Sequence, residues 1–408
     1  EEVGMNYAAN IYPFRQDSDF FYLTGFSEPE SLAVLVPGRE QGEYLLFCRE
    51  YDVQKSVWTG HHAGLEGARK DFAADDAFPI EDMDEIIPGL LENRERVYYP
   101  MDQGGELHAR LLEWVHQLRG KARMGVSAPS ELVSVEHLLH DMRLFKSAAE
   151  LAVTRKAAHA SVAAHARAMQ ACRPGMYEYQ LEAELLYEFA VQGMRFPAYP
   201  SIVAGGGNAC VLHYTSNSDK LQDGDLVMID AGAEHQNYAA DISRTFPVNG
   251  RFSEPQRIVY ELALEAQAAA IAKIKPGNHW IEPHDAAVRV LTKGMIRLGL
   301  LKGRLNKLIK DEKYKQFYMH RTGHWLGMDV HDVGDYKVGG EWRMFEPGMV
   351  LTVEPGLYIP ADCKKVDKPW RGIGVRIEDD VLVTKDGCEV LTAAAPKTVN
   401  EIERVMQG

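Results

Sequence analysis

Two aspartates with a spacing suited to metal chemistry, Asp230 and Asp241, lie in the stretch DLVMIDAGAEHQNYAADISRTF, residues 225–246. An apolar run rich in Val and Ile ends on Asp230, which favours a buried strand over a helix. A second run contains Asp241 and follows a short polar break at His235 and Gln236. If the two runs form a hairpin around this break, the two aspartates lie directly opposite each other, with Cβ atoms about 5 Å apart.

Two carboxylates that face each other on a half-buried sheet repel one another and are costly to desolvate. A divalent cation is the simplest compensation, but a solvent-facing hairpin with two unrelated acids explains this stretch equally well. His-Gln is not a preferred two-residue turn, so a shift of the register by a residue or two also stays open.

A second pair of acids follows the same pattern. Glu354 ends the apolar run of MVLTVEPG, and Glu378 shares a strand face with Arg376 in GIGVRIEDD. If these strands pair across the loop 360–371, Glu354 and Glu378 face each other as the aspartates do. Glu378 also fits an acidic strand end, because two aspartates follow it, whereas a carboxylate inside an apolar strand such as Glu354 needs a partner.

Three histidines, His320, His324 and His331, lie within twelve residues of one another in a segment with several glycines, which favours a loop or bulged strand over a helix. A single histidine is usually structural, but this cluster beside buried acids points to function. Two aspartates, two glutamates and a histidine form the ligand set of a two-metal site. The hard oxygens and one imidazole suit Mn²⁺, Co²⁺ or Zn²⁺, and leave the native metal open.

The composition is that of an ordinary globular protein, with 46% hydrophobic and 25% charged residues over 408 positions. The formal net charge of -14 argues against a nucleic-acid ligand. Five scattered cysteines without a CxxC pair predict a reduced, cytoplasmic protein. We find neither a membrane-spanning run nor a signal segment, and because the chain starts at Glu1 without Met we expect a short segment before it.

The order of elements predicts an α/β (α+β) fold with two domains. We expect an N-terminal α/β domain over residues 1–125, a connecting segment over 126–146 with one helix near 130–141, and a second, larger domain over 147–408. The expected elements of the N-terminal domain are strands at 31–38, 43–50 and 96–100 and a helix at 106–118.

The second domain begins with the capping box formed by Ser147 and Glu150. This box predicts a helix to about residue 172, and Ser253 opens a corresponding helix that ends before Pro276. Second helices follow at 177–192 and 282–298, a polar segment at 302–315 is expected in solvent, and paired strands with two acids close each half. The repeated order suggests an internal pseudo-twofold symmetry.

Several of these segments resemble one known family. NACVLHYTSN, DGDLVMIDAGAE, YAADISRTFPVNG, MHRTGHWLGMDVHDVG, EPGMVLTVEPGLYI and RGIGVRIEDDVLVT are similar to motifs of the pita-bread metallopeptidases, specifically the aminopeptidase P family. FRQDSDFFYLTGFSEPES resembles that family's N-terminal domain. The resemblance spans nearly the whole chain and implies a pita-bread catalytic domain behind a smaller N-terminal α/β domain.

The resemblance also implies the site. The family binds two divalent metal ions, usually Mn²⁺, which here gives the ligands Asp230, Asp241, His324, Glu354 and Glu378. Glu354 is also implied in catalysis, together with the substrate-side histidines His213, His320 and His331. Tyr358 and Arg376 match positions that line the pocket.

Two further positions bear on the family comparison. Trp58 matches a tryptophan that a neighbouring subunit contributes in family tetramers, so we expect a homo-oligomer, either a dimer or a tetramer. Arg321 and Thr322 depart from the family pattern, because relatives often carry smaller residues between the corresponding histidine and glycine. The departure leaves the ligands intact and alters the pocket.

The implied activity is hydrolysis of the bond between an N-terminal residue and a following proline, so the expected partners are peptides with proline in second place. One alternative is a prolidase, which cleaves only Xaa-Pro dipeptides and would use a group such as Arg376 to bind the terminal carboxylate. Another is a non-catalytic peptide-binding module. The complete ligand set argues against that module and against the metal-free creatinase branch.

Overall fold

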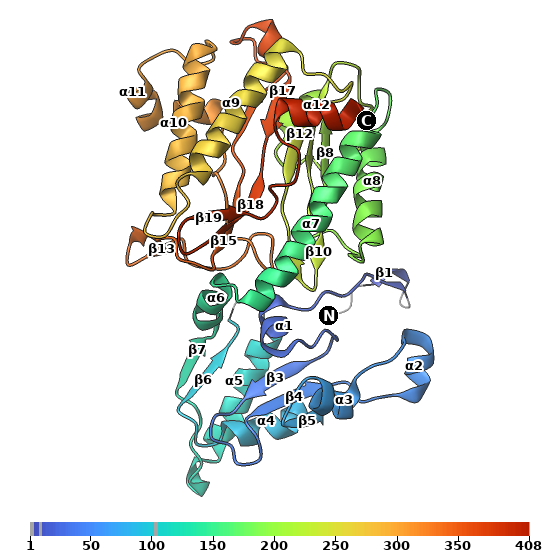
Figure 1. The fold of residues 1–408 in the computed structure, drawn as a ribbon. Coiled ribbons are helices and arrows are strands. Elements are labelled where there is room, and N and C mark those ends of the chain that lie inside the picture. Colours follow the sequence, from blue (N-terminus) through green and yellow to red (C-terminus); the bar gives the residue numbers. More distant parts are fainter. Residues whose placement is uncertain (1–3, 8–9, 102–104, 408) are drawn as a thin grey trace. The chain divides into compact units, whose positions relative to one another are not determined.

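The computed structural model describes residues 4–7, 10–101 and 105–407. The chain divides into two compact units, residues 1–139 and 140–408 (Figure 1). Both units mix helices and strands, so the expected fold class is confirmed. None of the helices in these described ranges is long and apolar enough to cross a membrane.

The first unit is built on a three-stranded sheet in the order β3-β4-β5. β3 (Leu32–Leu35) is antiparallel to β4 (Tyr44–Cys48), and β4 is parallel to β5 (Asp76–Pro79). β6 (Arg96–Tyr99) and β7 (Glu131–Ser134) form a separate parallel pair. The other α-helices and strands of the first unit are β1 (Gly4–Tyr7), β2 (Asn10–Ile11), α1 (Ser18–Thr24), α2 (Val53–Thr59), α3 (Gly64–Asp71), α4 (Met83–Leu91) and α5 (Gly105–Gly120).

The predicted helix near 130–141 is wrong in its first half. Residues Glu131–Ser134 form β7, and α6 begins only at Glu136 and ends at Leu144. The segment Glu-Leu-Val-Ser contains the β-branched Val133, and parallel pairing with β6 overrides any helical tendency. The division at residues 125 and 147 stays a prediction.

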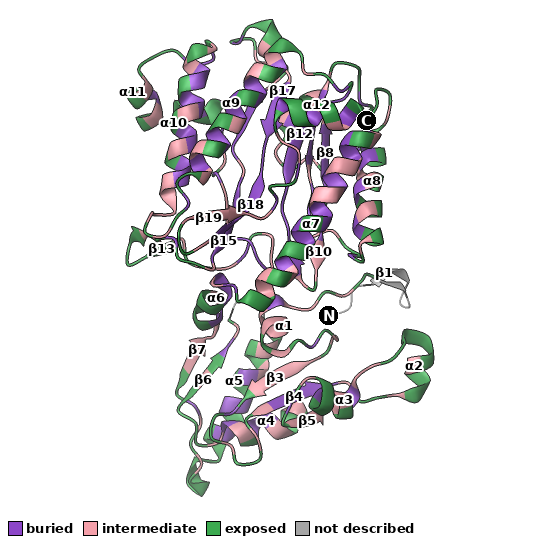
Figure 2. Cartoon of the chain, in the orientation of Figure 1, coloured by how far each residue is buried: buried purple, intermediate pink, exposed green. Residues whose placement is uncertain are grey.

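Two pairs of helices cover the strands of the second unit. α7 (Ala148–Ala171) packs on α8 (Glu178–Val191), and α9 (Glu254–Ile271) packs on α10 (Ile281–Arg297). The capping box at Ser147 is confirmed, since its side chain accepts from the Glu150 amide and the Glu150 carboxylate accepts from the Ser147 amide. Figure 2 shows these helices with one buried and one exposed face over strands that are almost wholly buried.

The strands of the second unit form two groups that match the two predicted halves. β9 (Leu226–Asp230) lies between β8 (Ile202–Gly205) and β12 (Ser243–Pro247). In the other half β18 (Asp379–Val383) lies between β15 (Val350–Val353) and β19 (Cys388–Val390), and β16 (Gly356–Ile359) pairs with β17 (Ile373–Arg376). The remaining elements are β10 (Glu234–His235), β11 (Tyr238–Ala239), α11 (Leu305–Lys310), β13 (Lys337–Val338), β14 (Glu341–Trp342) and α12 (Val399–Gln407).

The segment 302–315 is less solvated than its lysines suggested. It contains α11, and the side chains of Leu308 and Tyr314 are buried against the main core of the second unit. Its apolar residues therefore anchor the segment while the lysines remain outside.

The register predicted for the aspartate hairpin is wrong by two residues. The tight turn is Gln236-Asn237, both with positive φ (47° and 63°), and not His235-Gln236. Asp230 consequently pairs with Ser243, and Asp241 lies two residues before this partner. Because side chains alternate with a period of two, a shift of two residues leaves both carboxylates on the same face, as diagonal instead of direct neighbours.

The register predicted for the glutamates is confirmed. β15 pairs with β18 up to Val353 opposite Asp379, and β16 pairs with β17 from Gly356 opposite Arg376. Both ladders keep one register, which places Glu354 opposite Glu378 in the short gap between them.

Candidate metal centre and active site

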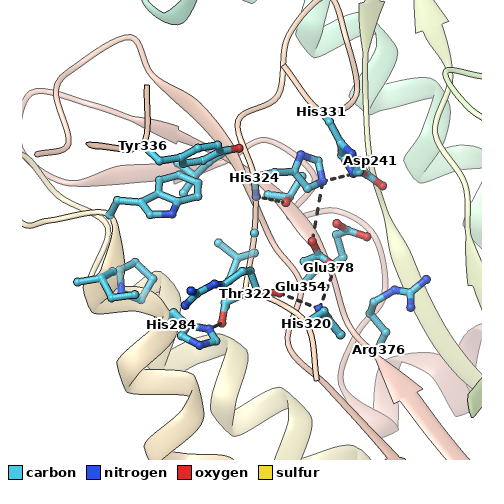
Figure 3. A pocket seen from close by; sticks show the side chains of 18 of the residues that line it. Asp241, His284, His320, Thr322, His324, His331, Tyr336, Glu354, Arg376 and Glu378 are labelled. Atoms are coloured by element: carbon cyan, nitrogen blue, oxygen red, sulfur yellow. Dashed lines mark hydrogen bonds and ion pairs between the residues drawn. The ribbon is translucent and has the colours of Figure 1, made fainter. Parts of the chain in front are cut away.

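A cavity of about 810 Å³ in the second unit gathers most of the predicted site residues. Figure 3 shows His324, Asp241, Glu354 and Glu378 close together, with Arg376 beside them. The predicted residues that line the cavity are His213, Asp230, Asp241, His320, His324, His331, Glu354, Arg376 and Glu378. Two predicted residues are not in this lining, Tyr358 and Trp58.

Four carboxylates reach the cavity because each stands where a buried strand ends or begins. Asp230 is the last residue of β9, and Asp241 lies just before β12. Glu354 follows β15, and Glu378 precedes β18. The apolar strands are fixed by packing, so their ends hold the acids in place without long flexible loops.

His324 brings an imidazole to these acids. Its Nε2 lies 3.3 Å from Asp241 Oδ2 and 3.8 Å from Glu354 Oε1. Its Nδ1 lies 2.9 Å from the carbonyl oxygen of Trp325, which can only accept, so Nδ1 carries the proton and Nε2 is available as a ligand. Ligand atoms of Asp241, His324 and Glu378 all lie within 4.8 Å of one another.

Tyr199 joins the two aspartates and was missed by the sequence analysis. Its hydroxyl lies 2.7 Å from Asp230 Oδ1 and also contacts Asp241 Oδ1. Burial and the surrounding carboxylates raise the pKa of Tyr199 well above its usual value, so the phenol stays protonated and donates. No spacing rule marks a tyrosine about thirty residues before Asp230 as part of the site, and only the pairing of β8 with β9 brings it near.

Arg376 organises the acidic side of the cavity. Its Nη2 donates to Asp230 Oδ2 at 2.6 Å, its Nε to Ser243 Oγ at 2.9 Å and its Nη1 to Tyr358 Oη at 3.2 Å. Ser243 Oγ in turn contacts Glu378 Oε2 at 2.6 Å. One guanidinium therefore connects acids from both halves of the unit.

Tyr358 supports the cavity wall from behind. The residue is fully buried, and its hydroxyl lies 2.8 Å from His320 Nε2. Burial lowers the pKa of His320 to about 3, so this imidazole is neutral at neutral pH. Tyr358 thereby orients His320 and Arg376.

His331 packs on His324, with ring centroids 4.3 Å apart and the planes edge to face. Burial and the neighbouring His324 lower the pKa of His331, which keeps it neutral. Trp58 lies on α2 of the first unit with 89% of its surface exposed.

The departure at Arg321 and Thr322 shapes the part of the cavity away from the acids. Arg321 is exposed, and its guanidinium carbon lies 6.0 Å from the centre of the Trp342 ring. Thr322 is buried, and its hydroxyl contacts His284 Nδ1 at 2.8 Å and Tyr318 Oη at 2.6 Å. Burial lowers the pKa of His284 to about 4, so this pocket residue, also missed from the sequence, is neutral.

Residues 152–385 match the model of metallopeptidase family M24. The chain belongs to this family. Residues 1–98 match the aminopeptidase P N-terminal domain, so the resemblance to aminopeptidase P is confirmed.

Two similar relatives of this M24 chain are both named Xaa-Pro aminopeptidase. A Xaa-Pro aminopeptidase of Escherichia coli is 43% identical over 98% of this chain and 90% of its own length. A Xaa-Pro aminopeptidase of Haemophilus influenzae is 45% identical, over 97% of this chain and 89% of its own length. The solved structure of Pseudomonas aeruginosa aminopeptidase PepP matches with a TM-score of 0.98 and 58% identity, covering 100% of this chain and 92% of that one.

Membership of M24 implies divalent metal ions, and the charges of the cavity fit them. Burial and the carboxylate of Asp230 raise the pKa of Asp241 well above its usual value, and burial and Asp241 do the same for Glu378. Burial and Glu378 raise the pKa of Glu354 to about 8. Without a cation the ionised forms of these three acids are disfavoured, and the oxygen-rich set with one imidazole suits Mn²⁺, Co²⁺ or Zn²⁺.

Proposed function

We propose that this chain is a metal-dependent Xaa-Pro aminopeptidase, which removes the N-terminal residue from peptides whose second residue is proline. The observation that carries the proposal is the convergence of four buried carboxylates and His324 in one cavity of an M24 chain. The relatives named Xaa-Pro aminopeptidase support the same activity over nearly the full length.

Five residues would hold two divalent cations, for which we favour Mn²⁺ over Co²⁺ and Zn²⁺. These are Asp230, Asp241, His324, Glu354 and Glu378. Bound cations polarise a carbonyl and lower the pKa of water, which makes a nucleophile available at neutral pH.

Glu354 and Asp230 have different tasks in this proposal. Asp230 stays ionised because Arg376 outweighs the effect of burial on its pKa, so it can bind the free amine of the substrate. Glu354 accepts a proton from the attacking water and passes it to the proline nitrogen as the peptide bond breaks. Its pKa of about 8 in the metal-free protein shows how weakly the site favours the ionised form before cations bind.

Two histidines stabilise the charge that develops on the carbonyl oxygen. His213 and His331 line the cavity beside the acids and donate hydrogen bonds to this oxygen and to the leaving side, an effect worth a few kcal/mol per donor, about 2.7–4 in a well-studied protease. His320, held by Tyr358, faces the substrate. The nitrogen of proline carries no hydrogen in a peptide, so the pocket can select the ring without an acceptor for an N-H.

The state of Arg376 favours an aminopeptidase over a prolidase. A prolidase needs a group that captures the terminal carboxylate of a dipeptide. Each donor nitrogen of Arg376 is already engaged, by Asp230, Ser243 and Tyr358. Arg376 is therefore not set up to bind the carboxylate of a terminal proline, and a peptide with a further residue after the proline is not excluded.

The test is to strip the protein of metal, add Mn²⁺ and follow a tripeptide Xaa-Pro-Yaa and the matched dipeptide Xaa-Pro. We expect release of the first residue from the tripeptide only with metal. Cleavage of the dipeptide alone would replace the proposal by a prolidase. Metal binding without cleavage of either peptide would replace it by a peptide-binding module.

We further propose a homo-oligomer in the cytoplasm. α2 exposes 80% of Val57 and 89% of Trp58, apolar surface that a second copy could cover, as expected of a dimer or tetramer. The five cysteines are free, which suits a reducing compartment. Light scattering of the purified chain tests the assembly, and cell fractionation tests the compartment.

A further inference from the structure

A buried ion cluster lies beneath the histidine segment of the cavity. Asp332 accepts from Arg143 Nη2 at 2.7 Å and from Lys146 Nζ at 2.9 Å. The side chains of Lys146 and Asp332 are each 1% exposed and that of Arg143 is 3% exposed. Charges this deep are tolerated only with well-placed partners, so the three side chains fix one another's positions closely.

The backbone of Asp332 is tied to His324 through one oxygen. The amide of Asp332 donates to the carbonyl oxygen of Trp325 at 2.9 Å, and His324 Nδ1 donates to the same oxygen at 2.9 Å. This shared acceptor sets which nitrogen of His324 is protonated and where the ring points. Displacement of Asp332 would therefore change the position of His324 Nε2.

The same segment carries His331, which directly precedes Asp332 and stacks edge to face on His324. Asp332 itself is not among the residues that line the cavity. Its carboxylate instead pairs with Arg143 and Lys146. It can act on the reaction only by holding its neighbours.

Gly327 shows how closely the chain approaches this cluster. A Cβ at Gly327 would lie 2.0 Å from Asp332 Oδ2 and 2.9 Å from Lys146 Cε. The carbonyl oxygen of Gly327 also accepts from the amide of Ala239, two residues before Asp241. The turn at Gly327 therefore contacts both the ion cluster and the strand that leads to a predicted metal ligand.

We propose that Asp332, clamped by Lys146 and Arg143, is a positioning residue that sets the geometry of His324 for the metal and of His331 for the substrate. The part that concerns the substrate rests on the proposed function. The competing explanation is that the cluster stabilises the fold and has no influence on the site.

The experiment compares Lys146→Met and Gly327→Ala with the wild-type protein and with Gly387→Ala. A Cβ at Gly387 meets nothing within 4 Å, which makes this variant a matched control. Folding is checked by circular dichroism, the dissociation constant for Mn²⁺ is measured by calorimetry on the metal-free protein, and kcat and KM are measured on a Xaa-Pro-Yaa tripeptide. We expect the Mn²⁺ dissociation constant to rise about 10-fold or more in both test variants, and kcat to fall more than KM rises.

Gly327→Ala keeps every charge of the cluster. If Lys146→Met does not fold, the Mn²⁺ dissociation constant and kcat of Gly327→Ala test the positioning role of Asp332. The conservative variant Lys146→Arg should restore Mn²⁺ binding to within about 3-fold of wild type, because it returns a cation to Asp332. Folded test variants with wild-type Mn²⁺ affinity and wild-type kcat would overturn the proposal in favour of a purely structural cluster. A wild-type protein that cleaves no Xaa-Pro peptide, but whose variants still lose Mn²⁺ affinity, would refute the proposed function and leave the positioning of His324 intact.

Discussion

Arg376 and Asp230 form an ion pair inside the cavity, with Nη2 2.6 Å from Oδ2. Burial alone would raise the pKa of Asp230, but the guanidinium holds it below its usual value. Asp241, whose carboxylate has no such contact in the described part of the chain, has its pKa raised well above the usual range. One cation thus makes two neighbouring aspartates unequal, which is the basis of the separate task proposed for Asp230.

Replacement of Arg376 tests this inequality. In Arg376→Met, Asp230 loses its cation while Ser243 and Tyr358 lose their donor, and we expect kcat/KM on a Xaa-Pro-Yaa tripeptide to fall at least about 100-fold, or about 2.7 kcal/mol. Arg376→Lys should recover only part of the loss, because an ammonium cannot reach three acceptors at once.

The control for this prediction is Arg257→Met on α9. Arg257 pairs with Glu261 on the exposed surface of the helix, where an ion pair contributes little. We expect this control to keep wild-type kcat/KM. An Arg376→Met protein with wild-type kcat/KM would show that the guanidinium has no part in the reaction.

The metal-free protein should lose stability as the pH rises from about 6.5 to 8. The folded state keeps a proton on Glu354 up to about pH 8, whereas the unfolded chain has already released it, so raising the pH favours unfolding. The size is about 1.4 kcal/mol per pH unit for a single group, and Asp241 and Glu378 act in the same direction. Urea unfolding in chelator at several pH values measures the slope.

The pH range of that prediction, about 6.5 to 8, is set at its lower end by buried histidines. Burial lowers the pKa values of His320 and His284 to about 3 and 4, so both stay neutral in the folded state. The unfolded chain takes up protons at these histidines below about pH 6.5, which lowers the folding stability as the pH falls. This dependence has the opposite sign to that of Glu354 and lies below the window. With Mn²⁺ present the cation replaces the protons, and the slope should vanish or reverse. A metal-free protein whose stability increases between pH 6.5 and 8 would contradict the assignment.

Tyr358→Phe removes one hydroxyl behind the cavity wall. His320 and Arg376 each lose a hydrogen-bond partner in a buried place, which costs about 1–3 kcal/mol of folding free energy. Since both side chains then turn more freely, we expect kcat/KM to fall about 10-fold, with most of the change in kcat. Urea unfolding and steady-state kinetics check the two parts, and a kinetic effect confined to KM would place Tyr358 in contact with the substrate instead.

Glu178 supports the loop that carries His213. Its buried carboxylate accepts from the amides of Gly205 and Asp219, from Asn208 Nδ2 and from Tyr214 Oη. In Glu178→Gln one acceptor becomes a donor that faces other donors, so we expect a loss of about 1–3 kcal/mol in stability and a lower kcat/KM.

Glu265→Gln on the exposed face of α9 is the matched control for Glu178, because Glu265 is a solvent-exposed glutamate of the same unit. It should change neither stability nor kcat/KM. Equal behaviour of the two variants would show that the four hydrogen bonds to Glu178 are dispensable for the loop.

The sequence predicted the parts of the site that depend on local patterns. Apolar runs that end on Asp230 and Glu354 mark strand ends, and the capping box at Ser147 marks the start of a helix, because each pattern is complete within a few residues. The register that places Glu354 opposite Glu378 followed from the same alternation.

Contacts between segments that are distant in the sequence could not be predicted, because no local sequence pattern marks them. Tyr199 meets Asp241 across 42 residues, and Lys146 meets Asp332 across 186. A lone tyrosine or lysine has no spacing to reveal its partner, and only the folded chain brings the pairs together. The prediction of the turn in the aspartate hairpin was wrong for a different reason. Glutamine rarely adopts a positive φ, so the residue type of Gln236 did not indicate a turn at this position.

That turn gives the last prediction. Gln236 and Asn237 both have positive φ, the requirement of the two-residue turn that Asn-Gly fills best. The double variant Gln236→Asn with Asn237→Gly should therefore stabilise the protein by about 1 kcal/mol, measured by urea unfolding, because a left-handed conformation costs about 1–2 kcal/mol for a residue with a Cβ and glycine avoids this cost. His235→Gly is the informative control: His235 pairs with Tyr238 within the hairpin, so glycine there should destabilise the protein. If glycine at His235 stabilised the protein and the double variant did not, the turn would lie at His235-Gln236 and Asp230 would directly face Asp241.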